Sequence, residues 1–171
     1  MKKPLILLIL LAAVLFVAGC SEKTQNNTTN SSQNISANFT LVEATRMEQI
    51  NTSLKKGPVL VKIGADWCEA CQDMEKTLSV LAVEYGDKVS IMKIDIDRSP
   101  KLAAYFQYNV IPDTFVISGI KKGEYVYMQE DGNITTDRFK ARILKLEDKT
   151  VFEKTLNYAL KREKAKLKNK P

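Results

Sequence analysis

Histidine is absent from this chain of 171 residues, and cysteine occurs only three times. A closed structural zinc site usually needs four cysteine or histidine ligands in tetrahedral geometry. Because three thiols cannot complete that set, we expect no metal site within the chain and no cofactor. Internal repeats are not apparent either, and nothing marks a dedicated dimerisation segment. We therefore expect a single folded domain in a monomer.

Long apolar runs are also scarce. The run Leu5–Ala18 is unbroken, but it is shorter than the roughly 20 residues that span a bilayer as a helix. Lys2 and Lys3 precede it, and small residues lead from it to Cys20. This start resembles a lipoprotein signal peptide, which implies that residues 1–19 are removed and that a lipid on Cys20 anchors the protein to the cell membrane, outside the cytoplasm. The alternative is an uncleaved anchor helix, which leaves the domain in the same compartment.

Apolar residues are nearly missing from residues 21–38, where five asparagines and seven serines or threonines stand among eighteen residues. Such a composition buries too little apolar surface to fold, so residues 20–38 are predicted to be a disordered tether that begins at the lipidated cysteine. Five Asn-x-Ser/Thr sequons make glycosylation of this tether a hypothesis. They begin at Asn26, Asn27, Asn30, Asn34 and Asn38.

Acidic residues are outnumbered, with 20 of them against 26 lysines and arginines and a net charge of +6. Six of the basic residues lie between Lys161 and Lys170, against one acid, Glu163. A charged terminal helix is most often simply solvated, and the alternative is attraction to anionic lipid headgroups. We expect no nucleic-acid partner for an exported protein.

Two thiols stand three positions apart in Trp67-Cys68-Glu69-Ala70-Cys71, where an apolar strand pattern gives way to a helical one. At the first turn of a helix, unpaired N–H groups and the helix dipole stabilise a thiolate and make it nucleophilic. Two thiols one helical turn apart can also close on each other. The pattern favours reversible disulfide chemistry, and a structural or inactive cysteine pair is the alternative.

The residues around this motif follow a familiar order. An apolar strand at Val59–Ile63 runs into the motif, a second strand carries Asp95 and Asp97, and Ile111-Pro112 precedes a third strand. These elements resemble the thioredoxin superfamily over about residues 39–165. The resemblance implies an α/β thioredoxin fold, in which helices flank a central mixed β-sheet.

Periodicity and turn residues predict the elements of this fold. Because residues 119–145 are more than a minimal thioredoxin needs, we expect an extended hairpin there, and we expect a basic tail at 166–171. The predicted strands are 39–42, 59–63, 88–96, 114–118, 125–129 and 139–146, with a turn at Asp131-Gly132. The predicted helices are 44–55, 68–85 and 99–107, and a last one carries Phe152, Leu156, Ala159 and Leu160 on its apolar face.

The resemblance also implies roles for the site residues. Cys68 is the attacking thiolate and Cys71 resolves the mixed disulfide. Pro112 is in cis opposite the sulfurs, so that the backbone of Ile111 offers hydrogen bonds to an extended substrate segment. Trp67 shields one side of the disulfide and contacts the partner, and plain core packing is its alternative.

Three residues depart from the thioredoxin pattern. Lys62 stands where thioredoxins carry a buried acid, so it is a candidate for proton relay or for stabilising a thiolate; pairing with Asp95 on the next strand is the slightly favoured alternative. Glu69 repels a neighbouring thiolate, which favours a reducing protein. Asp113 follows Pro112 and makes a Pro-acid-Thr-Phe run that looks like that of membrane-tethered cytochrome c maturation reductants.

Together these features predict a membrane-anchored, extracytoplasmic thiol-disulfide oxidoreductase that uses Cys68 and Cys71 to reduce disulfides of exported proteins. Its electrons would come from a membrane thiol carrier. Net oxidation or isomerisation of disulfides is a second enzymatic interpretation. A non-catalytic peptide-binding module, with a groove beside Ile111 and Pro112, is the alternative from another class.

Overall fold

The computed structural model describes residues 41–144 and 148–168. The predicted signal peptide, the predicted lipidation site Cys20 and the predicted tether lie outside these residues. Within them, no helix is both long enough and apolar enough to cross a membrane.

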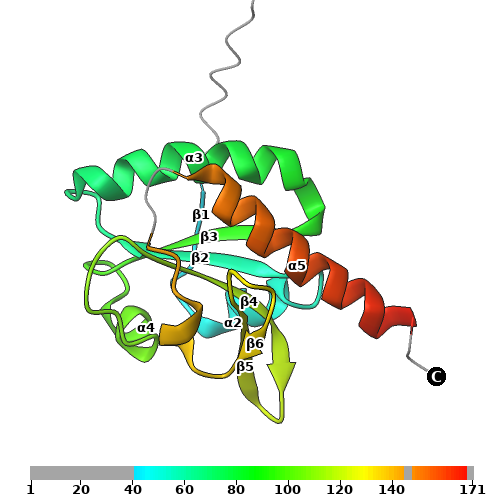
Figure 1. The fold of residues 1–171 in the computed structure, drawn as a ribbon. Coiled ribbons are helices and arrows are strands. Elements are labelled where there is room, and N and C mark those ends of the chain that lie inside the picture. Colours follow the sequence, from blue (N-terminus) through cyan, green and yellow to red (C-terminus); the bar gives the residue numbers. More distant parts are fainter. Residues whose placement is uncertain (1–40, 145–147, 169–171) are drawn as a thin grey trace, which may run out of the picture. The chain divides into compact units, whose positions relative to one another are not determined.

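A six-stranded mixed sheet forms the centre of the domain, with the strand order β1-β3-β2-β4-β5-β6 (Figure 1). The strands β1, β3 and β2 run parallel, and β4, β5 and β6 continue the sheet in antiparallel pairs. The strands are β1 (Val42–Glu43), β2 (Val59–Gly64), β3 (Ser90–Asp95), β4 (Asp113–Lys121), β5 (Glu124–Met128) and β6 (Ile134–Thr135). The predicted α/β thioredoxin fold is confirmed by this arrangement.

Helices cover both faces of the sheet. On one face, α2 (Met47–Ser53) and α4 (Pro100–Tyr105) contribute Ile50, Leu102 and Ala103 to a buried cluster. On the other face, α3 (Glu69–Tyr85) and α5 (Lys149–Lys168) contribute Met74, Leu78, Leu81, Phe152, Leu156 and Ala159 to a second cluster. The apolar spacing that predicted α3 and α5 therefore marks the sides that pack on the sheet.

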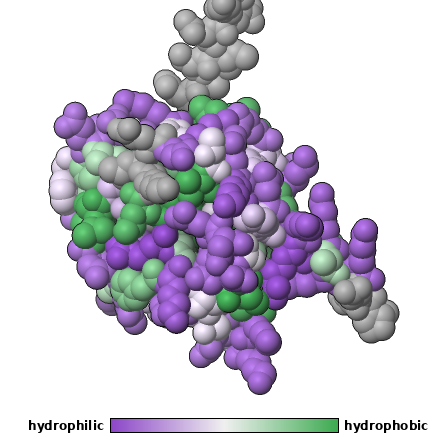
Figure 2. Space-filling model, in the orientation of Figure 1, coloured by the Kyte–Doolittle hydropathy of each residue, from purple (hydrophilic) through white to green (hydrophobic). Residues whose placement is uncertain are grey.

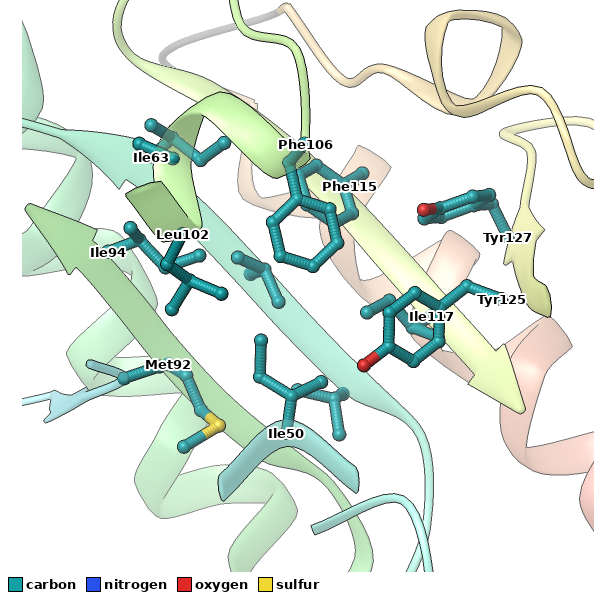
Figure 3. Packing of buried hydrophobic residues seen from close by; sticks show 14 of the residues in the cluster. Ile50, Ile63, Met92, Ile94, Leu102, Phe106, Phe115, Ile117, Tyr125 and Tyr127 are labelled. Carbon is teal, nitrogen blue, oxygen red and sulfur yellow. The ribbon is translucent and has the colours of Figure 1, made fainter. Parts of the chain in front are cut away.

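Aromatic side chains fill the first cluster. Phe106 lies 5.1 Å from Phe115 between ring centres and stacks on Tyr125, while Tyr127 meets Phe115 edge to face (Figure 3). Burial of each large apolar side chain contributes roughly 1.5–3 kcal/mol. These contacts join α4 to β4 and β5, and so they position the loop that connects α4 with β4.

The central strand β2 is buried along its whole length, because it lies between β3 and β4 and has helices over both faces. Strands covered on both faces read as continuous apolar runs rather than alternating ones. Lys62 is the exception within this strand, and its side chain is only 2% exposed. A buried ammonium needs partners, which makes Lys62 a feature of the site rather than of the core.

The hairpin between β4 and β5 turns at Lys122 and Gly123, both with positive φ. Two such residues suit the two-residue turns that match the twist of antiparallel strands. The turn at Asp131 and Gly132 then leads from β5 into the short strand β6.

The strand predicted at 139–146 is wrong. The chain instead forms a 3₁₀ turn at Arg138–Ala141, begun by the Asp137 side chain accepting the N–H of Phe139, and only Ile143 pairs with β4, opposite Thr114. Arg142 within this segment and Arg138 just before it bind the buried carboxylate of Asp113. Residues 145 and 146 lie outside the described part.

The short strand β6 was not predicted. The other helices and strands were predicted with small errors at their ends. Helix α2 begins at Met47 rather than at residue 44, and β1 lies at Val42–Glu43, at the end of the predicted strand 39–42. The helix α5 continues through Lys168, beyond the predicted domain end at 165.

Candidate active site

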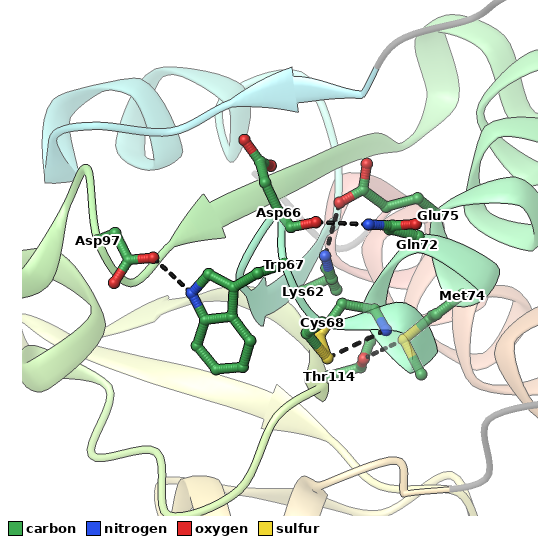
Figure 4. The surroundings of a disulfide bond; sticks show 10 residues. Lys62, Asp66, Trp67, Cys68, Gln72, Met74, Glu75, Asp97 and Thr114 are labelled. Carbon is green, nitrogen blue, oxygen red and sulfur yellow. Dashed lines mark hydrogen bonds and ion pairs between the residues drawn. A yellow bond between two sulfur atoms is a disulfide. The ribbon is translucent and has the colours of Figure 1, made fainter.

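Cys68 and Cys71 are joined by a disulfide at the point where β2 leads into α3 (Figure 4). Buried β2 ends at Gly64, and the chain leaves the sheet through Ala65, Asp66 and Trp67 before the helix begins. Cys68 is the N-cap residue of α3, with extended backbone. The long helix thus holds the first cysteine at its positive end and the second one turn further on.

The two sulfurs have different surroundings. Cys68 is half-buried, and its Sγ accepts the backbone N–H of Cys71 at 3.2 Å, whereas the Cys71 side chain is fully buried. The N–H donor and the helix dipole both favour negative charge on Cys68 Sγ. The geometry therefore fits Cys68 as the sulfur that meets a partner and Cys71 as the one that closes behind it.

The loop before β4 lies beside this pair. The Ile111–Pro112 peptide bond is cis, as the resemblance implies. Because Asp113 pairs with Ile63 in the antiparallel register of β2 and β4, Pro112 lies at the end of β2 from which the cysteine loop departs. Pro112 is buried, Ile111 is half-buried, and Val110 is 52% exposed. The loop therefore offers backbone and apolar surface next to Cys68.

Trp67 projects into solvent, with 69% of its surface exposed, so core packing is not its role. Its indole N–H donates to Asp97 at 2.8 Å, which fixes the ring beside the disulfide (Figure 4). Hydrophobic surface gathers on the side of the molecule where α3 begins (Figure 2). Asp66, next to Trp67, is bound by Arg98, and this guanidinium holds the pKa of the Asp66 carboxyl below its usual range.

Lys62 does not pair with Asp95, contrary to the favoured prediction. In the parallel register Lys62 lies opposite Lys93, and Asp95 lies opposite Gly64. Asp95 instead accepts the backbone N–H groups of Asp97 and Arg98. The prediction failed because strand register, which the sequence does not display, decides which side chains are neighbours.

The partner of Lys62 is Glu75 on α3. The Lys62 ammonium donates to Glu75 at 2.6 Å (Figure 4). The Lys93 ammonium reaches the other oxygen of the same carboxylate at 3.1 Å. Burial lowers the pKa of Lys62, while the bond to Glu75 acts in the opposite direction. Asp66 also lies 3.8 Å from the Lys93 ammonium, so the two lysines of this cluster face two carboxylates.

Gly64 allows this cluster to approach the deeper sulfur. A Cβ at position 64 would lie 2.7 Å from the Lys62 ammonium and 2.9 Å from Cys71 Sγ. The Lys62 ammonium and Cys71 Sγ both lie close to this one position. The distance between them is therefore within the roughly 6 Å over which a charge acts strongly on an ionisable neighbour. Lys62 therefore lies within the range at which its charge acts on Cys71.

Asp113 is fully buried behind the loop, and two arginines bind it. Arg138 Nη1 donates to Asp113 Oδ2 at 2.9 Å and Arg142 Nε donates to Asp113 Oδ1 at 3.2 Å. Asp113 was noted from the sequence, but its two arginine partners and Glu75 were not predicted. A carboxylate inside an apolar strand was the available signal, since such a group needs cationic partners.

Glu69 lies exposed in the first turn of α3, close in sequence to both sulfurs, so its predicted influence on the thiols remains an expectation. In residues 41–144 and 148–168, no three cysteine, aspartate or glutamate side chains gather in a way that could hold a metal ion. The described residues therefore provide a cysteine pair for disulfide chemistry, with charged side chains close to it.

Comparison with known proteins agrees with this geometry. The family model for thioredoxin matches residues 37–151. Thioredoxin X from chloroplasts of Arabidopsis thaliana is 37% identical over 86 residues, which are 50% of this chain and 46% of that protein. Thioredoxin of Chlamydia trachomatis is 32% identical over 84 residues, which are 49% of this chain and 81% of that protein.

Among solved structures, a mutant thioredoxin from Halobacterium salinarum shares the fold, with a TM-score of 0.51 and 22% identity over 69% of this chain and 89% of that one. The chain spans about half the length of the chloroplast relatives it matches, 46% of thioredoxin X and 49% of the M-type thioredoxin of Chlamydomonas reinhardtii. With its Trp-Cys-x-x-Cys pair at the start of α3 and a matching domain over 37–151, the chain belongs to the thioredoxin family.

Proposed function

We propose that this protein is a thiol-disulfide oxidoreductase in which the Cys68/Cys71 pair, as a dithiol, exchanges with disulfides of client proteins and becomes the internal disulfide. One observation carries the proposal: a half-buried sulfur at a helix N-terminus is bonded to a fully buried sulfur one turn deeper. That asymmetry separates an attacking thiol from a resolving one.

In the reducing direction, the Cys68 thiolate attacks one sulfur of a client disulfide. A mixed disulfide forms, and the other client sulfur leaves as a thiolate that takes up a proton. The Cys71 thiolate then attacks Cys68 Sγ, which restores the internal disulfide and releases the second client thiol. Two electrons pass from the protein to the client, and the adjacent Lys62 ammonium favours ionisation of Cys71 in the second step.

The proposed direction is reduction. Glu69 adds negative charge beside Cys68, which disfavours the reduced, ionised form and makes the couple less oxidising. The cluster around Lys62 acts the other way, and Glu75 offsets part of its charge. Because Glu69 and Lys62 act in opposite directions on the couple, net oxidation of client thiols is the second candidate. The reduction potential of the Cys68/Cys71 pair distinguishes reduction from oxidation.

The proposed location is the outer side of the cell membrane, with a lipid on Cys20 as the anchor. Support comes from the sequence of residues 1–20, which resembles a lipoprotein signal peptide. Electrons would then reach the domain from a membrane thiol carrier, and clients would be exported proteins. Basic residues on the last turns of α5 suit contact with anionic headgroups, and the protein is proposed to act as a monomer.

Insulin reduction tests the chemistry. The wild type should catalyse it and Cys68→Ala should abolish it. Cys71→Ala should accumulate a mixed disulfide with insulin that is visible on a non-reducing gel and disappears when reductant is added. A wild type that binds peptide but shows no turnover would favour the non-catalytic module instead.

Localisation needs a separate test. Mass spectrometry of the native protein should find a mature chain that begins with a lipid-modified Cys20, and Cys20→Ser should leave the protein without that modification. Recovery of the intact chain from Met1 in the membrane fraction would favour the uncleaved anchor helix.

A further inference from the structure

The Arg138 side chain forms hydrogen bonds with both ends of the loop that joins α4 to β4. The loop begins at Gln107, whose φ is +51°, and it ends at Asp113, the first residue of β4. Arg138 donates through Nη2 to the Gln107 carbonyl at 2.8 Å and through Nη1 to the Asp113 carboxylate at 2.9 Å. The exposed Val110 and the cis Ile111–Pro112 unit lie between these two points.

The groups that form these hydrogen bonds are buried and closely packed. The Arg138 side chain is 6% exposed and the Asp113 side chain is fully buried. The guanidinium carbon lies 4.5 Å from the centre of the Phe139 ring and 5.1 Å from that of Phe115. Charge-assisted hydrogen bonds in such surroundings are strong and fixed in direction, and a guanidinium presents its donors in a rigid fork that an ammonium lacks.

Arg142 offers an internal comparison. It donates to the other oxygen of Asp113 at 3.2 Å and lies 5.5 Å from the Phe139 ring, so it shares the acid and the aromatic neighbour with Arg138. The contact to the Gln107 carbonyl belongs to Arg138. Arg142 therefore neutralises Asp113, whereas Arg138 also joins the two ends of the loop.

Both arginines come from the 3₁₀ turn Arg138–Ala141 and the residue after it, in the stretch that the sequence predicts to be longer than a minimal thioredoxin needs. Immediately beyond, Ile143 donates its N–H to the Thr114 carbonyl at 2.8 Å, which ties the same stretch to β4 next to the loop. The additional residues thus pack as a support behind the loop that flanks Cys68.

We propose that Arg138 is a positioning residue that holds the loop Gln107–Asp113 in the form that receives an extended client segment beside Cys68. It touches neither the sulfurs nor a client, and it acts through Ile111 and Val110. This inference rests on the proposed disulfide exchange, because only a protein disulfide needs the loop, whereas a small disulfide needs the thiolate alone.

The test compares Arg138→Lys with Arg142→Lys in the full chain. Lysine keeps the positive charge beside Asp113, but one ammonium cannot reproduce the fork to both loop ends. For each variant we would measure KM and kcat for insulin, the rate of reaction of the reduced protein with the small disulfide 5,5′-dithiobis(2-nitrobenzoic acid), and amide hydrogen exchange at residues 108–111.

For Arg138→Lys we expect the insulin KM to rise about tenfold, the size that loss of one charge-assisted hydrogen bond allows. Its rate with the small disulfide should equal that of the wild type, and amides 109–111 should exchange faster. Arg142→Lys should match the wild type in all three measurements.

Equal losses of rate with insulin and with the small disulfide would show a general structural defect and overturn the proposal, as would an unchanged insulin KM in Arg138→Lys. If the wild type reduces neither disulfide, the proposed function fails, and amide exchange alone decides whether Arg138 holds the loop in place. Amide exchange in Arg138→Lys that is no faster than in Arg142→Lys would then refute the positioning role of Arg138.

Discussion

Replacing the buried lysine of β2 tests how charge acts on the deeper sulfur. Lys62→Met removes an ammonium that shares the space at Gly64 with Cys71 Sγ and leaves Glu75 paired with Lys93. Methionine is similar in length and apolar, so the buried site stays filled. Glu75 is 25% exposed and keeps Lys93 as its partner, so the substitution leaves no buried carboxylate without a cation and the variant is expected to fold.

The size of the expected shift in reduction potential follows from the short distance between the Lys62 ammonium and Cys71 Sγ. Unit charges about 6 Å apart interact by about 3 kcal/mol at an effective dielectric constant of about 20. If Cys71 is ionised in the reduced protein, loss of that attraction lowers the reduction potential by about 60 mV, and partial ionisation reduces the shift to about 20 mV. The sign is downward, because Lys62 stabilises the reduced, ionised form.

Equilibration against glutathione buffers of defined ratio measures this shift. Lys76→Met is the matched control, because Lys76 lies on α3 but points into water and pairs with Asp73. We expect the control to keep the wild-type potential. A Lys62→Met potential equal to that of the control, or above it, would refute the electrostatic role given to Lys62.

Three further changes follow from the same structure. Gly64→Ala places a methyl group 2.9 Å from Cys71 Sγ, so we expect a stability loss of about 1–3 kcal/mol in urea unfolding, and an unchanged stability would contradict the close approach. Trp67→Ala should alter stability by less than about 0.5 kcal/mol, because the side chain is 69% exposed, yet it should weaken insulin turnover; a large loss of stability with normal turnover would reverse that assignment. Burial raises the pKa of Tyr125 to about 12 and raises the pKa of Tyr127 as well. The folded state then keeps protons that the unfolded chain releases above about pH 10, so thermal stability should be constant near pH 9 and fall between pH 10 and 12. A melting temperature that is flat through pH 12 would contradict this burial.

Local patterns were sufficient to predict the redox centre. The apolar run of β2, the switch to helical spacing and the two cysteines lie within a short stretch, so local periodicity predicted where β2 and α3 meet. The cis bond before Pro112 followed from the resemblance and is present. Helix α5 was predicted from Phe152, Leu156 and Ala159, all of which are buried.

The charged contacts could not be predicted in the same way. Glu75 stands thirteen positions from Lys62, and Arg138 stands 25 positions from Asp113, so these pairs form only when helix and sheet pack together. Hydrophobic periodicity shows which face turns inward, but it does not show which buried charges meet. The strand predicted at 139–146 failed for the same reason, because Arg142 in that segment and Arg138 just before it bind Asp113.

The central claim is that Cys68 and Cys71 form a reversible two-electron couple on the reducing side. Equilibration of the wild-type chain in thiol-disulfide buffers measures it directly, with the dithiol and disulfide forms separated by alkylation and mass. We expect a midpoint near about −270 mV, the level of thioredoxin. A midpoint near about −120 mV would contradict the reducing role, and the absence of any reversible exchange would contradict the couple itself.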